Sequence, residues 1–378
     1  MLKAWFESPH FPTTSLLVAA LLSGTALAQE APAIPRPDPA VAEFARGVNF
    51  TVAGYNGGAE ALTNFPVLVR ISESGISGFR YADFNNADGS DIGFVDAEGN
   101  GLAYDIDTWD TNGESLVWVN LPVMTNNAEF AMWYHSSKTG KALNPDNVWT
   151  NYAGVWHFAE DYGTETGSVN VYDSTTNGLT GATLYNNTTK GASVSGGRVG
   201  RARRMGDNLA DANKGTGGID VELGGADSPK RAAVDRLASP TPVFSTSFWI
   251  YPEMNVRYPY YVSRKNADTY PAWAIQSNDN KAGSANAFRV FSRGTSSGAN
   301  MGVSNVGAAQ NKWTKIDVVY TAEGTSGKGY FYVNGVLKNN GNLNSGKAAN
   351  GSVDLYIGGG SGGDCRPLGG VMDEVRLQ

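Results

Sequence analysis

The chain has 378 residues, more than a single hydrophobic core usually organises, so its length predicts two domains. Its 47 glycines and 11% aromatic residues, against only 17% charged residues, favour short strands joined by tight turns. They predict an all-β fold. The formal net charge of -7, with both signs scattered along the chain, argues against a nucleic-acid partner, and the single cysteine, Cys365, excludes an intrachain disulfide.

Residues 1–28 have the pattern of a signal peptide. Lys3 gives a positive start, residues 15–22 form an apolar stretch, and the small residues 26–28 mark a cleavage site. We therefore expect the mature protein to begin at Gln29 and to be secreted or to lie in the periplasm or cell envelope. The apolar stretch is shorter than the ~20 residues that span a bilayer, so we expect no membrane span in the mature chain.

A proline-rich linker is expected at residues 29–45, where four prolines occur without apolar periodicity. A small β-sandwich is expected to follow at residues 46–150. Its short runs of β-branched and aromatic residues predict strands at 65–71, 91–95, 102–108, 115–121 and 128–135. Residues 116–121 are apolar on both faces, which is typical of a central strand.

Residues 138–151 break this pattern, and a second domain is expected at residues 151–378. Its predicted strands are 154–158, 244–251, 260–265, 288–292, 313–320, 329–333, 336–338, 353–357 and 371–377. Asn334 and Gly335 separate two of these runs, and this pair is the one that a type I′ hairpin turn requires.

Motifs in both domains resemble known families. The order FPVLVRI, DIGFVDAEGNGLAYDIDTWD, SLVWVNLP and EFAMWYH resembles the bacterial domain of unknown function 2341. The order VWHFAED, DSTTNG, GRVGRARRMG, FSTSFWIYPE, GYFYVNGVLK, LYIGGG and GGVMDEVRL is similar to the concanavalin A-like, laminin G-like jelly rolls. The resemblance implies an all-β fold of two antiparallel β-sandwich domains of the jelly-roll type, with the smaller sandwich placed ahead of a laminin G-like module in an envelope protein. It implies no activity for the first domain.

Carbohydrate binding needs aromatic rings that stack on sugar faces and polar groups that bond the hydroxyls. The stretch from 258 to 273 supplies aromatic residues among prolines that favour loops. We expect Tyr258, Tyr270 and Trp273 to bind the ligand, although packing in the core is the alternative for each of them.

A structural calcium ion is a second expectation. Asp173 opens the motif DSTTNG and Asp373 lies in the closing motif, and oxygen ligands of this kind suit calcium at the loop edges of a sandwich. The resemblance to family positions implies that this ion would join early and late strands. Asp373 could equally cap a turn or pair with an arginine.

The sequence does not favour catalysis, and no catalytic residue is predicted. Glycoside hydrolysis needs paired carboxylates, and the only similar spacing is Asp105 and Asp107, which would share one face of a strand in the first domain. His135 and His157 lie in apolar runs of different domains, where packing is the favoured role.

The sequence therefore predicts an exported, non-catalytic binding protein whose partner is a glycan or a cell-surface protein. Two alternatives stay open. One is a carbohydrate-active enzyme, and the other is an accessory module of an envelope transport complex.

Overall fold

The structure of the protein is a computed structural model. It describes residues 44–55, 60–136, 147–161, 168–184, 193–205, 218–235, 243–254, 259–264, 272–277, 286–293, 298–301, 307–323, 326–343, 353–359 and 366–378. The predicted signal peptide and almost all of the linker lie outside these residues.

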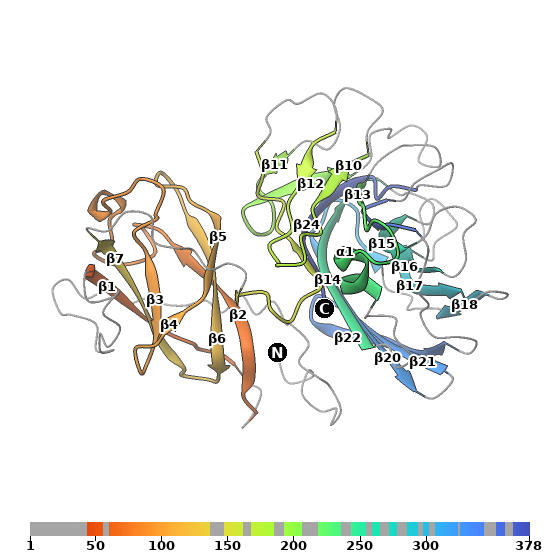
Figure 1. The fold of residues 1–378 in the computed structure, drawn as a ribbon, viewed down its shortest axis with the longest axis horizontal. Coiled ribbons are helices and arrows are strands. Elements are labelled where there is room, and N and C mark those ends of the chain that lie inside the picture. The colour runs from red at the N-terminus through yellow and green to blue at the C-terminus, as the bar shows by residue number, and fades with distance from the viewer. Residues whose placement is uncertain are drawn as a thin grey trace. The chain divides into compact units, whose positions relative to one another are not determined.

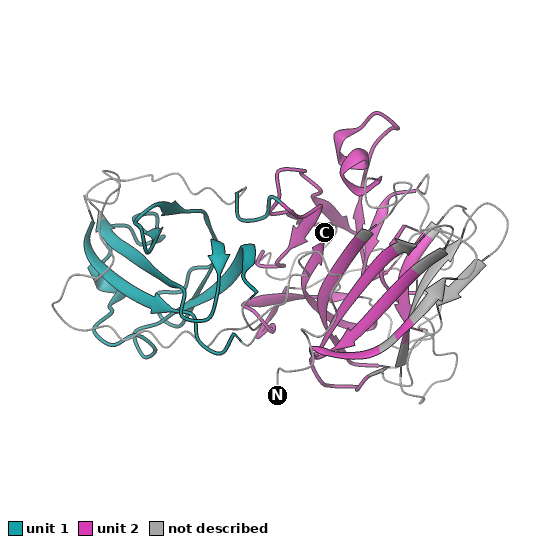
Figure 2. Cartoon of the chain, turned by 90° about the horizontal axis from the view of Figure 1, so that it is seen from below, with its two compact units in different colours: residues 1–150 teal, residues 151–378 magenta. Residues whose placement is uncertain are grey.

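The chain divides into two compact units, residues 1–150 and 151–378, which Figure 2 colours separately. The described part consists of strands, with one 3-10 turn (η1, Tyr81–Asp83) and one short helix (α1, Pro229–Asp235). This composition confirms the predicted all-β sandwich fold. None of the helices in the described ranges has the length and apolar character needed to cross a membrane.

The first unit is built from two antiparallel sheets. One has the strand order β1-β7-β3-β4 and the other the order β2-β6-β5. Their strands are β1 (Phe44–Thr51), β2 (Leu62–Ile71), β3 (Gly93–Asp96), β4 (Gly101–Leu102), β5 (Tyr104–Thr108), β6 (Ser115–Met124) and β7 (Glu129–Ser136). Alternate residues of the paired strands β2 and β6, such as Val67, Val69, Val117 and Val119, are buried together in the core of this unit.

The second unit also contains two large sheets (Figure 1). The nine-stranded sheet runs β18-β17-β16-β15-β23-β13-β10-β9, with β19 paired to β17. The eight-stranded sheet runs β11-β12-β24-β14-β20-β21-β22, with β8 paired to β24. In chain order, its first strands are β8 (Gly154–Trp156), β9 (Asn170–Val171), β10 (Gly181–Thr183), β11 (Ser193–Ser195), β12 (Arg201–Met205), β13 (Ile219–Val221) and β14 (Val243–Pro252). The later strands are β15 (Tyr260–Arg264), β16 (Ala272–Ser277), β17 (Asn286–Arg293), β18 (Gly298–Met301), β19 (Gly307–Ala308), β20 (Thr314–Glu323), β21 (Ser326–Val333), β22 (Val336–Leu343), β23 (Leu355–Ile357) and β24 (Gly370–Leu377).

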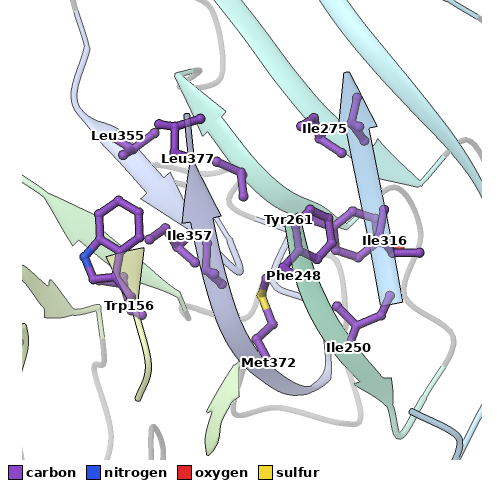
Figure 3. Packing of buried hydrophobic residues seen from close by; sticks show 14 of the residues in the cluster. Trp156, Phe248, Ile250, Tyr261, Ile275, Ile316, Leu355, Ile357, Met372 and Leu377 are labelled. Carbon is purple, nitrogen blue, oxygen red and sulfur yellow. The ribbon is translucent and has the colours of Figure 1, made fainter. Parts of the chain in front are cut away.

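The core of the second unit lies between these two sheets. Figure 3 shows Phe248 and Met372 from the eight-stranded sheet and Tyr261 and Ile357 from the nine-stranded sheet among its buried side chains. On a strand, every second residue shares a face. The residues that alternate with core positions on the nine-stranded sheet therefore lie on its opposite face, and this face carries the site described below.

The predicted hairpin near the C-terminus is confirmed. Strands β21 and β22 pair through Val333 and Val336, and Asn334 and Gly335 between them have φ angles of 50° and 78°. Positive φ at both central residues is the type I′ requirement.

Candidate functional site

Of the three predicted ligand-binding residues, Tyr258 and Tyr270 lie outside the described residues. Trp273 lies in strand β16 and is only 1% exposed. Its ring packs in the core with its centroid 5.2 Å from that of Phe244. The expectation that Trp273 presents a ring to solvent from a loop is therefore corrected: the residue pairs with Arg264 and Ser292 in the middle of a sheet and faces inward.

Asp173 holds a loop of the second unit together. Its Oδ1 accepts hydrogen bonds from the backbone N–H groups of Val155 and Thr175, at 2.9 and 3.0 Å. Its Oδ2 accepts from the Thr175 hydroxyl and the Leu179 N–H, at 2.7 and 2.8 Å. Burial raises the pKa of Asp173, and these hydrogen bonds oppose the increase without cancelling it. A carboxylate that already receives four donors does not fit a cation ligand, because hydrogens occupy its lone pairs.

Asp373 also joins distant segments. Its Oδ2 accepts a hydrogen bond from the backbone N–H of Val199 at 2.8 Å. Among the described residues, neither Asp173 nor Asp373 belongs to a group of three or more side chains placed to hold a metal ion. The calcium site therefore stays a prediction from the sequence, and the two carboxylates are used here as hydrogen-bond acceptors for backbone.

The carboxylates weighed for catalysis in the first unit have structural contacts. Asp105 Oδ2 accepts a hydrogen bond from Trp149 Nε1 at 2.9 Å, and Asp107 Oδ1 accepts one from the Thr108 hydroxyl at 2.8 Å. His135 Nδ1 lies 2.5 Å from the carbonyl oxygen of Asp83.

His157 belongs to a buried charged group in the second unit. Its Nδ1 lies 2.8 Å from Glu374 Oε1, and Glu374 Oε2 accepts a hydrogen bond from Arg376 at 2.6 Å. Burial alone would raise the pKa of Glu374, but His157 and Arg376 together outweigh burial and lower it to about 2. Glu374 is therefore an ionised partner in a salt bridge, which is a structural role.

The nine-stranded sheet carries a row of residues on the face opposite the core. The strand registers place its members side by side across six neighbouring strands. This polar row consists of Asn170 (β9), Ala182 (β10), Asp220 (β13), Tyr356 (β23), Ser263 (β15) and Ala274 (β16). Their chain neighbours Val171, Ile219, Val221, Ile357 and Val262 are all in the core, which sets the direction of the row.

The exposed fraction of the residues falls along the polar row from β9 towards β15. Asn170 is exposed, Ala182 and Asp220 are half-buried, and Tyr356 and Ser263 are buried. Two polar atoms of the row are buried and have no hydrogen-bond partner in the described part of the chain: Asp220 Oδ1 and Ser263 Oγ. Buried polar atoms are nearly always paired, so these two atoms mark the row as unusual.

Asp220 is the most electrostatically perturbed member of the polar row. Burial, followed by the nearby carboxylates of Asp354 and Glu222, raises its pKa to about 6. Asp354 is itself held in place, because its Oδ1 accepts a hydrogen bond from the Leu223 N–H at 2.8 Å and lies 3.9 Å from Arg231. At neutral pH Asp220 is mostly ionised and is a strong acceptor without a donor among these residues.

The polar row was not predicted from the sequence. The motifs GIDVE and VDLYI around Asp220 and Tyr356 alternate polar and apolar residues, and this alternation was the available signal. The strands concerned have only three residues each, and their side-by-side placement depends on pairing between segments far apart in the sequence.

Comparison with solved structures finds proteins with low sequence identity and low TM-scores. Domain 4 of AbnA, a GH43 extracellular arabinanase of Geobacillus stearothermophilus solved with arabinotriose, is 19% identical; the match covers 60% of this chain and 91% of that one, with a TM-score of 0.39. The CBM40 of the Ruminococcus gnavus IT-sialidase, bound to α2,6 sialyllactose, is 14% identical over 46% of this chain and 89% of that one, with a TM-score of 0.30. A Trypanosoma rangeli sialidase in complex with sialic acid is 12% identical over 88% and 49%, with a TM-score of 0.36.

No curated protein matches the chain. Two family models do. The model of the domain of unknown function DUF2341 matches residues 88–168, and the model named Laminin_G_3, of the concanavalin A-like lectin/glucanases superfamily, matches residues 224–378. The order of the two matches confirms the predicted order: the residues that match the DUF2341 model precede those that match the concanavalin A-like model.

Proposed function

We propose that the second unit binds carbohydrate through the polar row. The superfamily that its model matches is one of lectins and glucanases, which supports this class of ligand. The polar row combines a carboxylate, a phenol and a hydroxyl on adjacent strands, with short side chains at Ala182 and Ala274. Carboxylates and hydroxyls are the groups that bond sugar hydroxyls, and rigid strands hold them at fixed spacing.

The Asp220 carboxylate, one of whose oxygens has no hydrogen-bond partner among the described residues, carries this proposal. Asp220 Oδ1 and Ser263 Oγ lie on either side of Tyr356 in the row. Leaving a buried polar atom unbonded costs about 1–3 kcal/mol. Asp220 is half-buried, so a sugar hydroxyl can donate to its carboxylate, whereas the fully buried Ser263 lies beyond the reach of a ligand. The cost at Asp220 in the free protein would then be recovered on binding.

A glycan array tests the proposal. The array would carry single sugars up to hexasaccharides of glucose, xylose, arabinose, galactose and N-acetylglucosamine, and it would be probed with the full mature chain. We expect saturable binding that Asp220→Asn weakens about ten- to a hundredfold, since hydrogen bonds to charged groups contribute about 1.5–3 kcal/mol.

Asp227→Asn is the matched control, because Asp227 is an exposed aspartate of the same unit outside the polar row. Equal losses in the two variants would argue against a site at Asp220. An array on which the wild-type chain binds no sugar would contradict carbohydrate binding itself.

Hydrolysis of a glycoside is a second candidate function, favoured by one observation. Asp220, with its pKa of about 6, is suited to a general acid, and a second carboxylate, Asp354, lies directly before the neighbouring strand β23 and is close enough to raise that pKa. Incubating the array sugars with the protein and measuring new reducing ends separates the two functions. Release that Asp220→Asn abolishes would favour hydrolysis over binding alone.

We further propose that the protein acts outside the cytoplasm, on a glycan or a glycan-bearing surface protein. The signal-peptide pattern of residues 1–28 supports this location. Sequencing the N-terminus of protein recovered from the periplasm or medium would test it, and we expect the mature chain to start at Gln29.

A further inference from the structure

The edge of the nine-stranded sheet carries an exposed aromatic ring. Tyr172 follows strand β9 and is 54% exposed, the most exposed large aromatic side chain among those described. Its neighbour Val171 is buried in the core and pairs with Gly181 of β10. Tyr172 therefore comes directly after the edge strand that carries Asn170 of the polar row, and its exposed ring lies outside the core at this edge of the sheet.

The backbone that presents this ring is held on both sides. Val171 before it is in the core, and Asp173 after it accepts the four hydrogen bonds described above. The N–H of Tyr172 itself donates to Glu160 Oε1 at 2.7 Å. A large exposed ring on a fixed backbone loses little conformational entropy when a ligand stacks on it.

The exposure pattern gives the polar row an open end. Tyr172 and Asn170 at the edge strand are exposed, whereas Tyr356, three strands further in, is only 4% exposed. Strands in a sheet are ~4.8 Å apart, so β9 and β13, the strand of Asp220, are roughly 10 Å apart across the sheet. One sugar ring cannot bridge this distance, but a short chain of linked rings can.

We infer that the ligand is an oligosaccharide that lies across the strands, with an outer sugar stacked on Tyr172 and an inner sugar bonded by Asp220. This inference rests on the proposed function and adds a second subsite to it. The phenol face supplies apolar contact for the outer sugar ring, while Asn170 on the adjacent edge strand can bond its hydroxyl groups.

The test compares ligand length. The sugar series that binds best on the array would be titrated calorimetrically into the full mature chain, from the single sugar to the hexasaccharide. We expect affinity to rise with length in the wild type. In Tyr172→Ala we expect the longer oligosaccharides to bind about three- to tenfold more weakly, while the shortest one that binds is unaffected. Tyr172→Phe, which keeps the ring, should behave as the wild type.

Tyr330→Ala provides a control on a partly exposed tyrosine of the eight-stranded sheet. If Tyr172→Ala binds every length as the wild type does while Asp220→Asn loses binding, the outer subsite is wrong and the proposed function stands. If affinity is the same for all lengths in the wild type, the extended ligand is also wrong. If Asp220→Asn binds normally and only Tyr172→Ala fails, the polar row is not the site.

Discussion

Trp273 and Tyr356 belong to the same sheet but lie on opposite faces, and this difference decides what each residue can do. Trp273 points into the core and packs against Phe244. Tyr356 points away from the core and lies between Asp220 and Ser263. An aromatic residue contributes to stability in the first position and can contribute to recognition in the second.

Trp273→Ala should therefore act on stability. Removing a fully buried indole is expected to lower the free energy of unfolding of the second unit by about 3–5 kcal/mol, because it leaves a cavity between the sheets. Thermal unfolding followed by circular dichroism measures this loss. A variant that unfolds at the wild-type temperature would show that the indole does not pack as described.

The pKa of Asp220 predicts a pH dependence. Burial and the charges of Asp354 and Glu222 raise it to about 6, above the ordinary 3.8. Asp220 is ionised above pH 6, so we expect full sugar affinity at neutral pH and a fall as pH drops through 6. Asp220→Asn should flatten this profile.

The same shift affects stability with the opposite sign. The folded state binds the proton of Asp220 more tightly than the unfolded state, so this residue favours folding increasingly as pH falls from about 6 towards 4.

For the pH dependence of binding, a sugar affinity that is unchanged between pH 7 and pH 5 would argue against a role for the Asp220 carboxylate.

The orientation and the partners of individual side chains were the hardest features to predict from the sequence. The aromatic content around Trp273 was visible, but whether its ring faces inward depends on which strand pairs with β16, and no local pattern encodes that pairing. Asp173 was recognised as special, yet one of its four donors, the Val155 N–H, comes from a strand that only the fold brings next to it.

At the scale of elements, the β21–β22 hairpin shows how local chemistry determines a turn. Gly335 has a φ of 78°, in the left-handed region where a side chain costs about 1–2 kcal/mol. Gly335→Ala should therefore lower the free energy of unfolding by about that amount, as measured by urea denaturation. Gly225→Ala is the control, because a Cβ there meets no atom within 4 Å and no positive φ applies. Equal effects in both variants would contradict the turn argument.

Long strands were predictable, whereas several of the shortest ones were not. Strands β2, β6, β14 and β20 have ten residues each, enough for their apolar pattern to stand out. Strands β9, β10 and β13 have two or three residues and are stabilised by their neighbours in the sheet. These short strands carry half of the polar row, which explains why the fold was predictable while the site was not.

At the scale of the whole molecule, each unit has its own core. The second unit buries thirty residues of a single cluster drawn from both of its sheets. We therefore expect residues 151–378 to fold without the first unit and to bind the same sugars. A cooperative thermal transition of this fragment, with array binding equal to that of the full chain, would bear this out. A fragment that is unfolded would show that the second unit depends on the first.

The most direct test of the account is a calorimetric titration of the best array sugar into the full mature chain and into its Asp220→Asn and Asp227→Asn variants. If the polar row binds carbohydrate, the wild type and Asp227→Asn will bind with equal affinity and Asp220→Asn will bind at least about tenfold more weakly. Equal affinity in all three proteins would contradict the assignment of the site to the polar row.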